Sequence, residues 1–170
     1  MGGSGSGRRW HPGSRDTTEN SHAIDVRIWH RDGWLKPGSQ FVVEWLHGGK
    51  EAGSIGVLVH GGWVELIYRF RAGGGTWTDQ RHRVVLEWTS CNLGGQRPWF
   101  CCPTRGCRRR AGILYCNGQF ACRRCCGLVY QSQRESPADR AARKANRIRN
   151  KLGWQPGFFS PKGGKPNGMY

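Results

Sequence analysis

The residues with the clearest chemistry are two short pairs of cysteines. Four residues separate Cys102 from Cys107, two separate Cys122 from Cys125, and 14 residues lie between the pairs. Pairs of this kind lie on tight turns that direct two sulfurs at one point, and a hairpin between them brings the two turns together. The spacing therefore predicts a zinc ribbon in which these four cysteines bind one structural Zn²⁺.

The sequence contains more cysteines than one such site needs. The surplus residues are Cys91, Cys101, Cys116 and Cys126. We prefer Cys102 to Cys101 because Cys-Pro commonly opens such a turn, and Cys125 to Cys126 because the two-residue spacing is tighter. Whether a neighbour substitutes in either place stays open at this stage. We expect the surplus cysteines to act as small buried hydrophobic residues.

A site with four cysteine ligands leaves no coordination position for a reactive water, so the metal would support folding and not catalysis. The sequence has no Gly-x-Ser-x-Gly, no His-Glu-x-x-His and no phosphate-binding loop motif, and its six histidines are scattered. We therefore expect a protein that is not an enzyme.

Positive charge is concentrated in the second half of the chain. Lys and Arg total 27 against 11 for Asp and Glu, a net charge of +16. Residues 1–96 hold 11 basic and nine acidic residues, whereas residues 97–170 hold 16 basic residues and only Glu135 and Asp139. A solubilising surface would mix both signs. An excess of one sign on one part of a protein favours a polyanionic partner.

A predicted helix over 135–153 carries much of this charge. Ser136, Pro137 and Asp139 form helix-start signals, and Gly153 follows the last turn. Small and apolar residues recur on one predicted face, which we expect to pack on the protein, and cations recur on another. The expected phosphate contacts on the cysteine turns and this helix are Arg108, Arg109, Arg110, Arg123, Arg124, Arg140, Arg143, Lys144, Arg147 and Lys151.

The part of the chain that precedes the cysteines is predicted to form one helix and then a series of strands. A capping box at Asp16 and Glu19 predicts a helix over 17–32. Four β-rich runs separated by glycine-rich turns then predict an antiparallel meander, with Trp45, Trp63 and Trp88 in its core. The runs cover 41–46, 54–60, 63–71 and 81–89.

Together these features predict an α+β fold with a small antiparallel β-domain and an N-terminal helix, followed by the four-cysteine zinc ribbon and the basic C-terminal helix. The predicted divisions are a flexible Gly/Ser/Arg arm over 1–15, the helix and β-domain over 16–98, the ribbon over 99–131, the basic helix over 135–153 and a disordered tail over 154–170.

The sequence also resembles a family of small bacterial zinc-ribbon proteins found near mobile elements and prophages. The stretches that carry the resemblance are MGGSGSGR at 1–8, DVRIWHRDGWLKPG at 25–38, CNLGGQRPWFCCP at 91–103, FACRRCCGLVYQSQRES at 120–136 and DRAARKANRIRNKLG at 139–153. The resemblance implies that the N-terminal arm is native, and it supports the same four cysteine ligands. Cys126 departs from the family, which often has an aromatic residue or histidine there.

We therefore expect a cytoplasmic, non-enzymatic nucleic-acid-binding protein with one structural zinc ion, which prefers DNA to RNA and has no membrane segment. One alternative is a protein-interaction module, an inhibitor or adaptor of a mobile element, which uses its Trp-rich sheet for contact. Another is an accessory subunit that positions DNA for a recombinase or nuclease.

Overall fold

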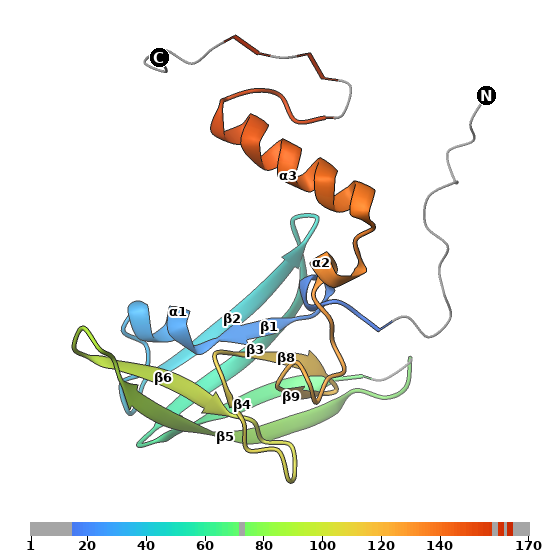
Figure 1. Ribbon diagram of the computed structural model, residues 1–170. Coiled ribbons are helices and arrows are strands. Elements are labelled where there is room, and N and C mark those ends of the chain that lie inside the picture. The colour runs from blue at the N-terminus through green and yellow to red at the C-terminus, as the bar shows by residue number, and fades with distance from the viewer. Residues whose placement is uncertain (1–14, 72–73, 158–159, 162, 165–170) are drawn as a thin grey trace. The chain divides into compact units, whose positions relative to one another are not determined.

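The computed structural model describes residues 15–71, 74–157, 160–161 and 163–164 (Figure 1). The predicted arm over 1–15 therefore lies outside the described residues except for Arg15. The chain divides into two compact units, one ending at Val129 and the other beginning at Tyr130, and each is considered by itself. The fold is mixed α+β, with mostly antiparallel sheets and few helices, as the sequence predicts.

The larger sheet of the first unit is an antiparallel meander in the order β2-β3-β4-β5-β6-β7. These strands cover Gln40–His47, Lys50–His60, Trp63–Phe70, Thr78–Ser90, Gln96–Cys101 and Arg110–Ala111. The first four contain the predicted β-rich runs almost entirely, so the meander is confirmed. Glycines at the hairpins adopt positive φ, for example Gly48 at 58° and Gly62 at 91°, which side-chain-bearing residues rarely do.

One face of this sheet forms the core, because successive side chains of a strand point to opposite faces. Val57 and Val59 of β3 are 2–3% exposed, and Val64 and Leu66 of β4 are fully buried. The opposite face carries polar and charged residues together with exposed apolar ones such as Val42 and Val85. The predicted core position of two tryptophans is wrong: Trp88 is 40% exposed, and Trp63 stacks on His60 on the outer face with ring centroids 3.7 Å apart.

A second antiparallel sheet packs against this core in the order β1-β8-β9. Its strands are Ala23–Asp25, Ile113–Asn117 and Gln119–Ala121. Phe120 of β9 is 1% exposed and contacts both Tyr68 and Trp45, with ring centroids 5.2 and 6.2 Å away. The small sheet therefore covers the apolar face of the meander.

The predicted helix over 17–32 is wrong for its first half. A short 3-10 turn at Thr18–Asn20 and strand β1 precede α1, which covers only Val26–Arg31. Asp25, not Asp16, is its N-cap, and the Asp25 carboxylate accepts a hydrogen bond from the backbone N–H of Arg27 at 2.9 Å. Ile24 instead pairs with Leu114 of β8 and is 1% exposed. Burial in a sheet has overridden a local helix signal.

The second unit contains α2 at Gln131–Arg134 and α3 at Pro137–Lys151. Ser136 caps α3 and exchanges hydrogen bonds with Asp139, as the start signals predict. The predicted packing face of α3 holds no buried residue, and Ile148 is 50% exposed. Arg149 donates hydrogen bonds to the carbonyls of Gln155, Ser160 and Pro161. These contacts hold the described part of a segment predicted to be disordered; the rest of that segment lies outside the described residues.

Among the described residues, none of the helices has both the length and the apolar character needed to cross a bilayer.

The aromatic contact between α1 and the meander is expected to contribute strongly to stability. Phe100 of β6 is fully buried and meets Trp29 of α1 edge-on, with ring centroids 5.2 Å apart. Phe100→Ala is expected to lower the free energy of unfolding by about 3–5 kcal/mol, because it removes a large buried side chain and leaves a cavity. Urea denaturation followed by circular dichroism measures this. Leu93→Ala is the control, since Leu93 is fully exposed and its truncation should change stability by less than about 0.5 kcal/mol.

Candidate metal centre

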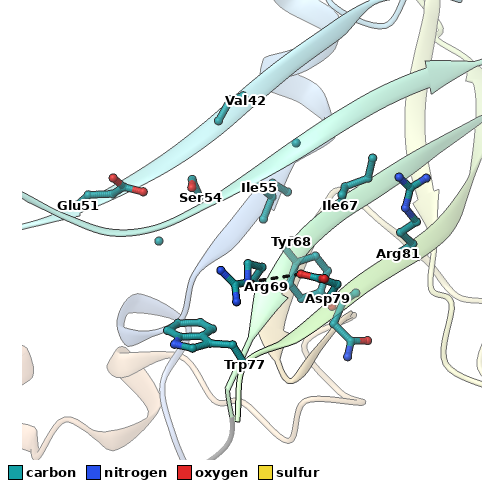
Figure 2. A pocket seen from close by; sticks show the side chains of 13 residues that line it. Val42, Glu51, Ser54, Ile55, Ile67, Tyr68, Arg69, Trp77, Asp79 and Arg81 are labelled. Carbon is teal, nitrogen blue, oxygen red and sulfur yellow. Dashed lines mark ion pairs between the residues drawn. The ribbon is translucent and has the colours of Figure 1, made fainter.

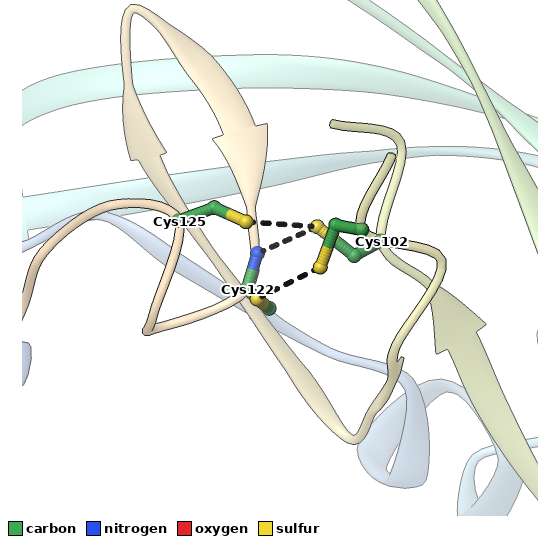
Figure 3. A group of neighbouring side chains, drawn as sticks. Cys102, Cys122 and Cys125 are labelled. Carbon is green, nitrogen blue, oxygen red and sulfur yellow. Dashed lines mark hydrogen bonds between the residues drawn. The ribbon is translucent and has the colours of Figure 1, made fainter. Parts of the chain in front are cut away.

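Four cysteine sulfurs converge on one point in the first unit. The Sγ atoms of Cys102, Cys107, Cys122 and Cys125 all lie within 4.8 Å of one another. Cys102 Sγ lies 3.9 Å from Cys125 Sγ, and Cys107 Sγ lies 3.8 Å from Cys122 Sγ. Figure 3 shows the labelled side chains of Cys102, Cys122 and Cys125 turned toward each other. Four thiols this close can hold one metal ion in tetrahedral coordination.

Each cysteine pair lies where a strand gives way to a tight turn. Cys102 directly follows β6, and its backbone N–H donates to the carbonyl of Arg109 at 2.8 Å. In the same loop, the N–H of Cys107 donates to the carbonyl of Thr104 at 2.9 Å. Gly106 has a φ of 79°, so the turn needs the conformational freedom of glycine there.

The second pair follows β9 in the same manner. The N–H of Cys126 donates to the carbonyl of Cys122 at 3.0 Å, which closes one turn around Cys122 and Cys125. Gly127 follows with a φ of 67°. The β8–β9 hairpin lies between the two cysteine loops in the sequence and returns the chain to the cluster, as the spacing predicts.

Hydrogen bonds lower the pKa of the Cys102 thiol. Burial raises the pKa of Cys102, but hydrogen bonds from Thr104 and from the backbone N–H of Cys122 outweigh burial and lower the pKa to about 7. The N–H of Cys122 lies 3.3 Å from Cys102 Sγ. A thiolate is the form that binds a metal, so these donors favour the binding state. Sequence reasoning missed the role of Thr104.

The neighbouring cysteines point away from the cluster. Cys101 Sγ donates to the carbonyl of Arg108 at 3.4 Å, and Cys126 Sγ donates to the carbonyl of Tyr115 at 3.3 Å. Burial raises the pKa of Cys126 to about 11 and also raises those of Cys101 and Cys116. These three are protonated thiols in partly or fully buried places, and the half-buried Cys91 is outside the group as well.

The arginines predicted beside the cysteines fall into two groups. Arg110 forms an ion pair with Glu87 at 2.8 Å, and Arg123 donates to the carbonyl of Leu128 at 2.9 Å, so both have structural contacts. The others on the two loops are exposed and form no ion pair within the part of the chain that the structure describes. They are Arg105, Arg108, Arg109 and Arg124.

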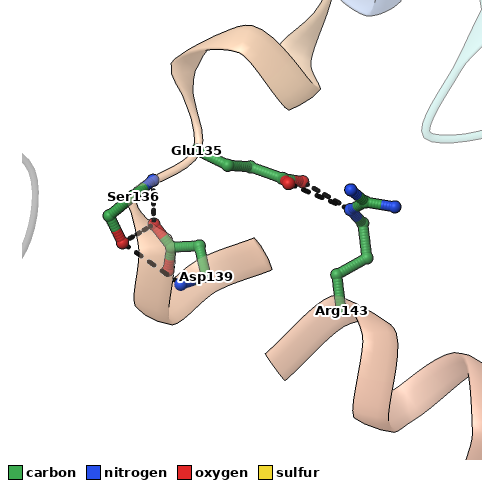
Figure 4. A network of polar contacts seen from close by, with 4 residues as sticks. All are labelled: Glu135, Ser136, Asp139 and Arg143. Carbon is green, nitrogen blue, oxygen red and sulfur yellow. Dashed lines mark hydrogen bonds and ion pairs between the residues drawn. The ribbon is translucent and has the colours of Figure 1, made fainter. Parts of the chain in front are cut away.

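The predicted cations of α3 in the second unit also include one that is ion-paired and several that are not. Arg143 is ion-paired with Glu135 at 2.8 Å, next to the Ser136–Asp139 cap (Figure 4). The remaining predicted cations of α3 lie one or two turns apart, are exposed and have no ion-pair partner among the described residues. They are Arg140, Lys144, Arg147 and Lys151.

Comparison with known proteins found no matching family model, no matching curated protein and no matching solved structure.

The choice between adjacent cysteines can be tested directly. Because only one member of each adjacent pair points into the cluster, Cys102→Ser and Cys125→Ser are expected to abolish metal binding at this site. Cys101→Ser and Cys126→Ser should retain one metal ion per chain. Elemental analysis of the purified variants measures this, and cobalt(II) loading adds a spectroscopic signature of four-thiolate tetrahedral coordination. Metal retained by Cys125→Ser but lost by Cys126→Ser would reverse the assignment.

Proposed function

We propose that the protein is a non-enzymatic nucleic-acid-binding protein whose two cysteine loops form a zinc ribbon that presents arginines to phosphates. The observation that supports this is the unequal distribution of ion pairs. On the meander, Arg69 pairs with Asp79 at 3.4 Å and Arg81 with Glu65 at 3.5 Å. Arg71 and Arg83 form no ion pair among the described residues, but their guanidinium groups lie over the rings of Trp77 and Trp63. The exposed arginines of the cysteine loops have no acidic partner among the described residues. Clustered cations without carboxylates attract a polyanion.

Zinc is the ion that best fits this donor set. Four thiolates suit a soft or borderline ion, and a closed tetrahedral set is typical of structural zinc. Four thiolates and one Zn²⁺ carry a net charge of −2, so nearby guanidinium groups are favoured. In this proposal the ion stabilises the two loops and thereby fixes where the arginines stand; it takes no part in a reaction.

The aromatic side chains near the cysteines favour duplex DNA over single strands. A single strand is typically bound by exposed aromatic rings on which bases stack. Phe100 is fully buried, Phe120 is 1% exposed and Tyr115 is 7% exposed, so none offers a ring face to a base. Trp99 is partly buried; its indole N–H donates to Thr89, and the guanidinium group of Arg97 lies over its ring. The loops therefore present charge without stacking surface, which suits a phosphate backbone. In α3 the cations recur at the spacing of one helix face, which suits the same ligand.

The contribution of the unpaired helix cations can be measured with a charge-neutral control. Lys144→Gln/Arg147→Gln is expected to weaken binding to duplex DNA and to reduce the slope of log affinity against log salt by about 2 from a starting value near −5. Fluorescence anisotropy across a salt series measures both quantities. Glu135→Gln/Arg143→Gln removes one ion pair without changing net charge, and it should leave the slope unaltered. A salt slope near zero for the unmodified protein would contradict the proposal.

Arg108 allows function to be separated from stability. Its φ of 47° makes it the non-glycine residue with positive φ among the described residues, a conformation that disfavours side chains. Arg108→Gly should therefore leave the melting temperature unchanged or raise it, because relief of backbone strain offsets the added entropy of the unfolded chain. The same variant should bind DNA more weakly through loss of a phosphate contact. Unchanged DNA affinity would remove Arg108 from the proposed surface.

A further inference from the structure

The meander forks where the pairing between β3 and β4 ends. The register between these strands ends at Gly56 and Ile67. Beyond that point β3 continues to pair with β2 as far as Lys50, while β4 continues to pair with β5 as far as Phe70. Figure 2 shows the two pairs of ribbons diverging around the labelled side chains. The fork therefore exposes two strand edges to each other.

Backbone polar groups face into this fork. Val59 of β3 exchanges its backbone hydrogen bonds with the 38–39 segment that leads into β2, so even-numbered residues of β3 face β4. Ser54 is the next even-numbered residue beyond the last pair at Gly56. By the same alternation, Arg69 of β4 faces β3. An unpaired strand edge is a template for another peptide strand, because its N–H and C=O groups lie at the spacing of a β-ladder.

The fork contains a groove of about 610 Å³. Phe120 lies behind both arms, since it contacts Trp45 from β2 and Tyr68 from β4. The groove wall includes Val42, which is 61% exposed, and Trp77, which is 53% exposed. Exposed apolar groups beside unpaired backbone are the two elements that strand addition uses.

Charge around Trp77 indicates what kind of segment fits. The guanidinium carbons of Arg71 and Arg69 lie 5.0 and 5.8 Å from the Trp77 ring centroid. Arg69 is paired with Asp79, so Arg71, which lies beside the groove, supplies an uncompensated positive charge next to Trp77. Glu51, which lines the groove on the β3 arm, forms no ion pair among the described residues, so the positive charge is confined to the Trp77 end. Arg81, further along, is paired with Glu65. One uncompensated cation beside an aromatic ring complements one carboxylate next to an apolar side chain; it is too little charge for a nucleic-acid backbone.

We propose that this fork binds an extended peptide segment of a partner protein, which adds as a β-strand, places an apolar side chain against Trp77 and an acidic side chain by Arg71. The site is separate from the cysteine loops and does not depend on the proposed DNA binding. Recognition rests on main-chain hydrogen bonds to the arms of the fork, and the groove selects the side chain.

The test uses the full chain at physiological salt, washed free of nucleic acid at high salt beforehand, and two end-blocked ten-residue peptides. High salt is avoided during binding because it would also screen the contact between Arg71 and a carboxylate. Both peptides alternate Thr and Val around a central Trp, which is flanked by Asp in one and by Lys in the other. The Asp peptide is expected to bind with a Kd of about 1 mM or tighter, to shift the amide resonances of Ser54 and Arg69 and to slow their hydrogen exchange. The Lys peptide should bind at least about tenfold more weakly.

Variants of the groove supply the controls. A Cβ at Gly56 would have only ordinary contacts, the nearest being 3.7 Å from the Ile67 carbonyl oxygen, so Gly56→Thr fills the groove without strain. Gly56→Thr and Trp77→Ala should each weaken binding of the Asp peptide at least about tenfold. Arg71→Glu should reverse the preference toward the Lys peptide. Val85→Thr, on the same face outside the groove, should bind like the unmodified protein.

Three results would overturn the proposal. They are no shift at Ser54 or Arg69 with either peptide, peptide binding that Gly56→Thr leaves unchanged, and shifts of these amides caused by a twelve-nucleotide oligothymidylate in place of the peptides. DNA binding by the cysteine loops is measured in low salt with different variants, so the two proposals succeed or fail separately.

Discussion

The convergence of four cysteine sulfurs connects the two sheets of the first unit. Cys102 directly follows β6 of the meander, and Cys122 directly follows β9 of the small sheet. Two residues before each of them stands an aromatic side chain, Phe100 or Phe120, which is at most 1% exposed. The same strands therefore anchor the core and deliver the thiols. A metal ion at this point would stabilise the packing of the sheets as well as the loops, because binding energy at a site that exists only in the folded chain is folding energy.

That junction also explains where cations can gather. Thiolates around a divalent ion leave excess negative charge, which compensates for several guanidinium groups that would otherwise repel each other. Arg105 and Arg124 stand within three residues of cysteines in the cluster, and no carboxylate neutralises them among the described residues. Arg110, which directly follows the first loop and pairs with Cys101 of β6, is instead bound to Glu87. The arginines near the cysteines are thus of two kinds: Arg110 has a carboxylate partner, and Arg105 and Arg124 have none among the described residues.

Sequence reasoning succeeded where one local pattern determines the outcome. Alternating β-rich runs, glycine turns and the Ser136 cap each depend on residues close together in the chain, and the cysteine spacing restricts the geometry strongly. It failed at Ile24, because a helical period cannot reveal that β8 offers a buried partner ninety residues later. Sequence reasoning could not predict the fork either, because no pattern in residues 50–70 indicates where two paired strands diverge. The Cys-Pro dipeptide favoured Cys102 over Cys101 from the sequence, and the structure supplies the physical reason, which is the direction that β6 gives each side chain.

Phe120 links features that otherwise look independent. It contacts Tyr68 of β4 and Trp45 of β2 in the core, and it stands two residues before Cys122. Tyr68 Oη also donates to the carbonyl of Gly118 in the β8–β9 hairpin at 3.2 Å, so the hairpin is bonded to the β4 arm directly. The hairpin that delivers Cys122 therefore also packs against residues of β2 and β4, the strands on the two sides of the fork. Close-packed interiors transmit displacement between neighbours, and the positions of Trp45 and Tyr68 are consequently tied to the same hairpin position that brings the four sulfurs together.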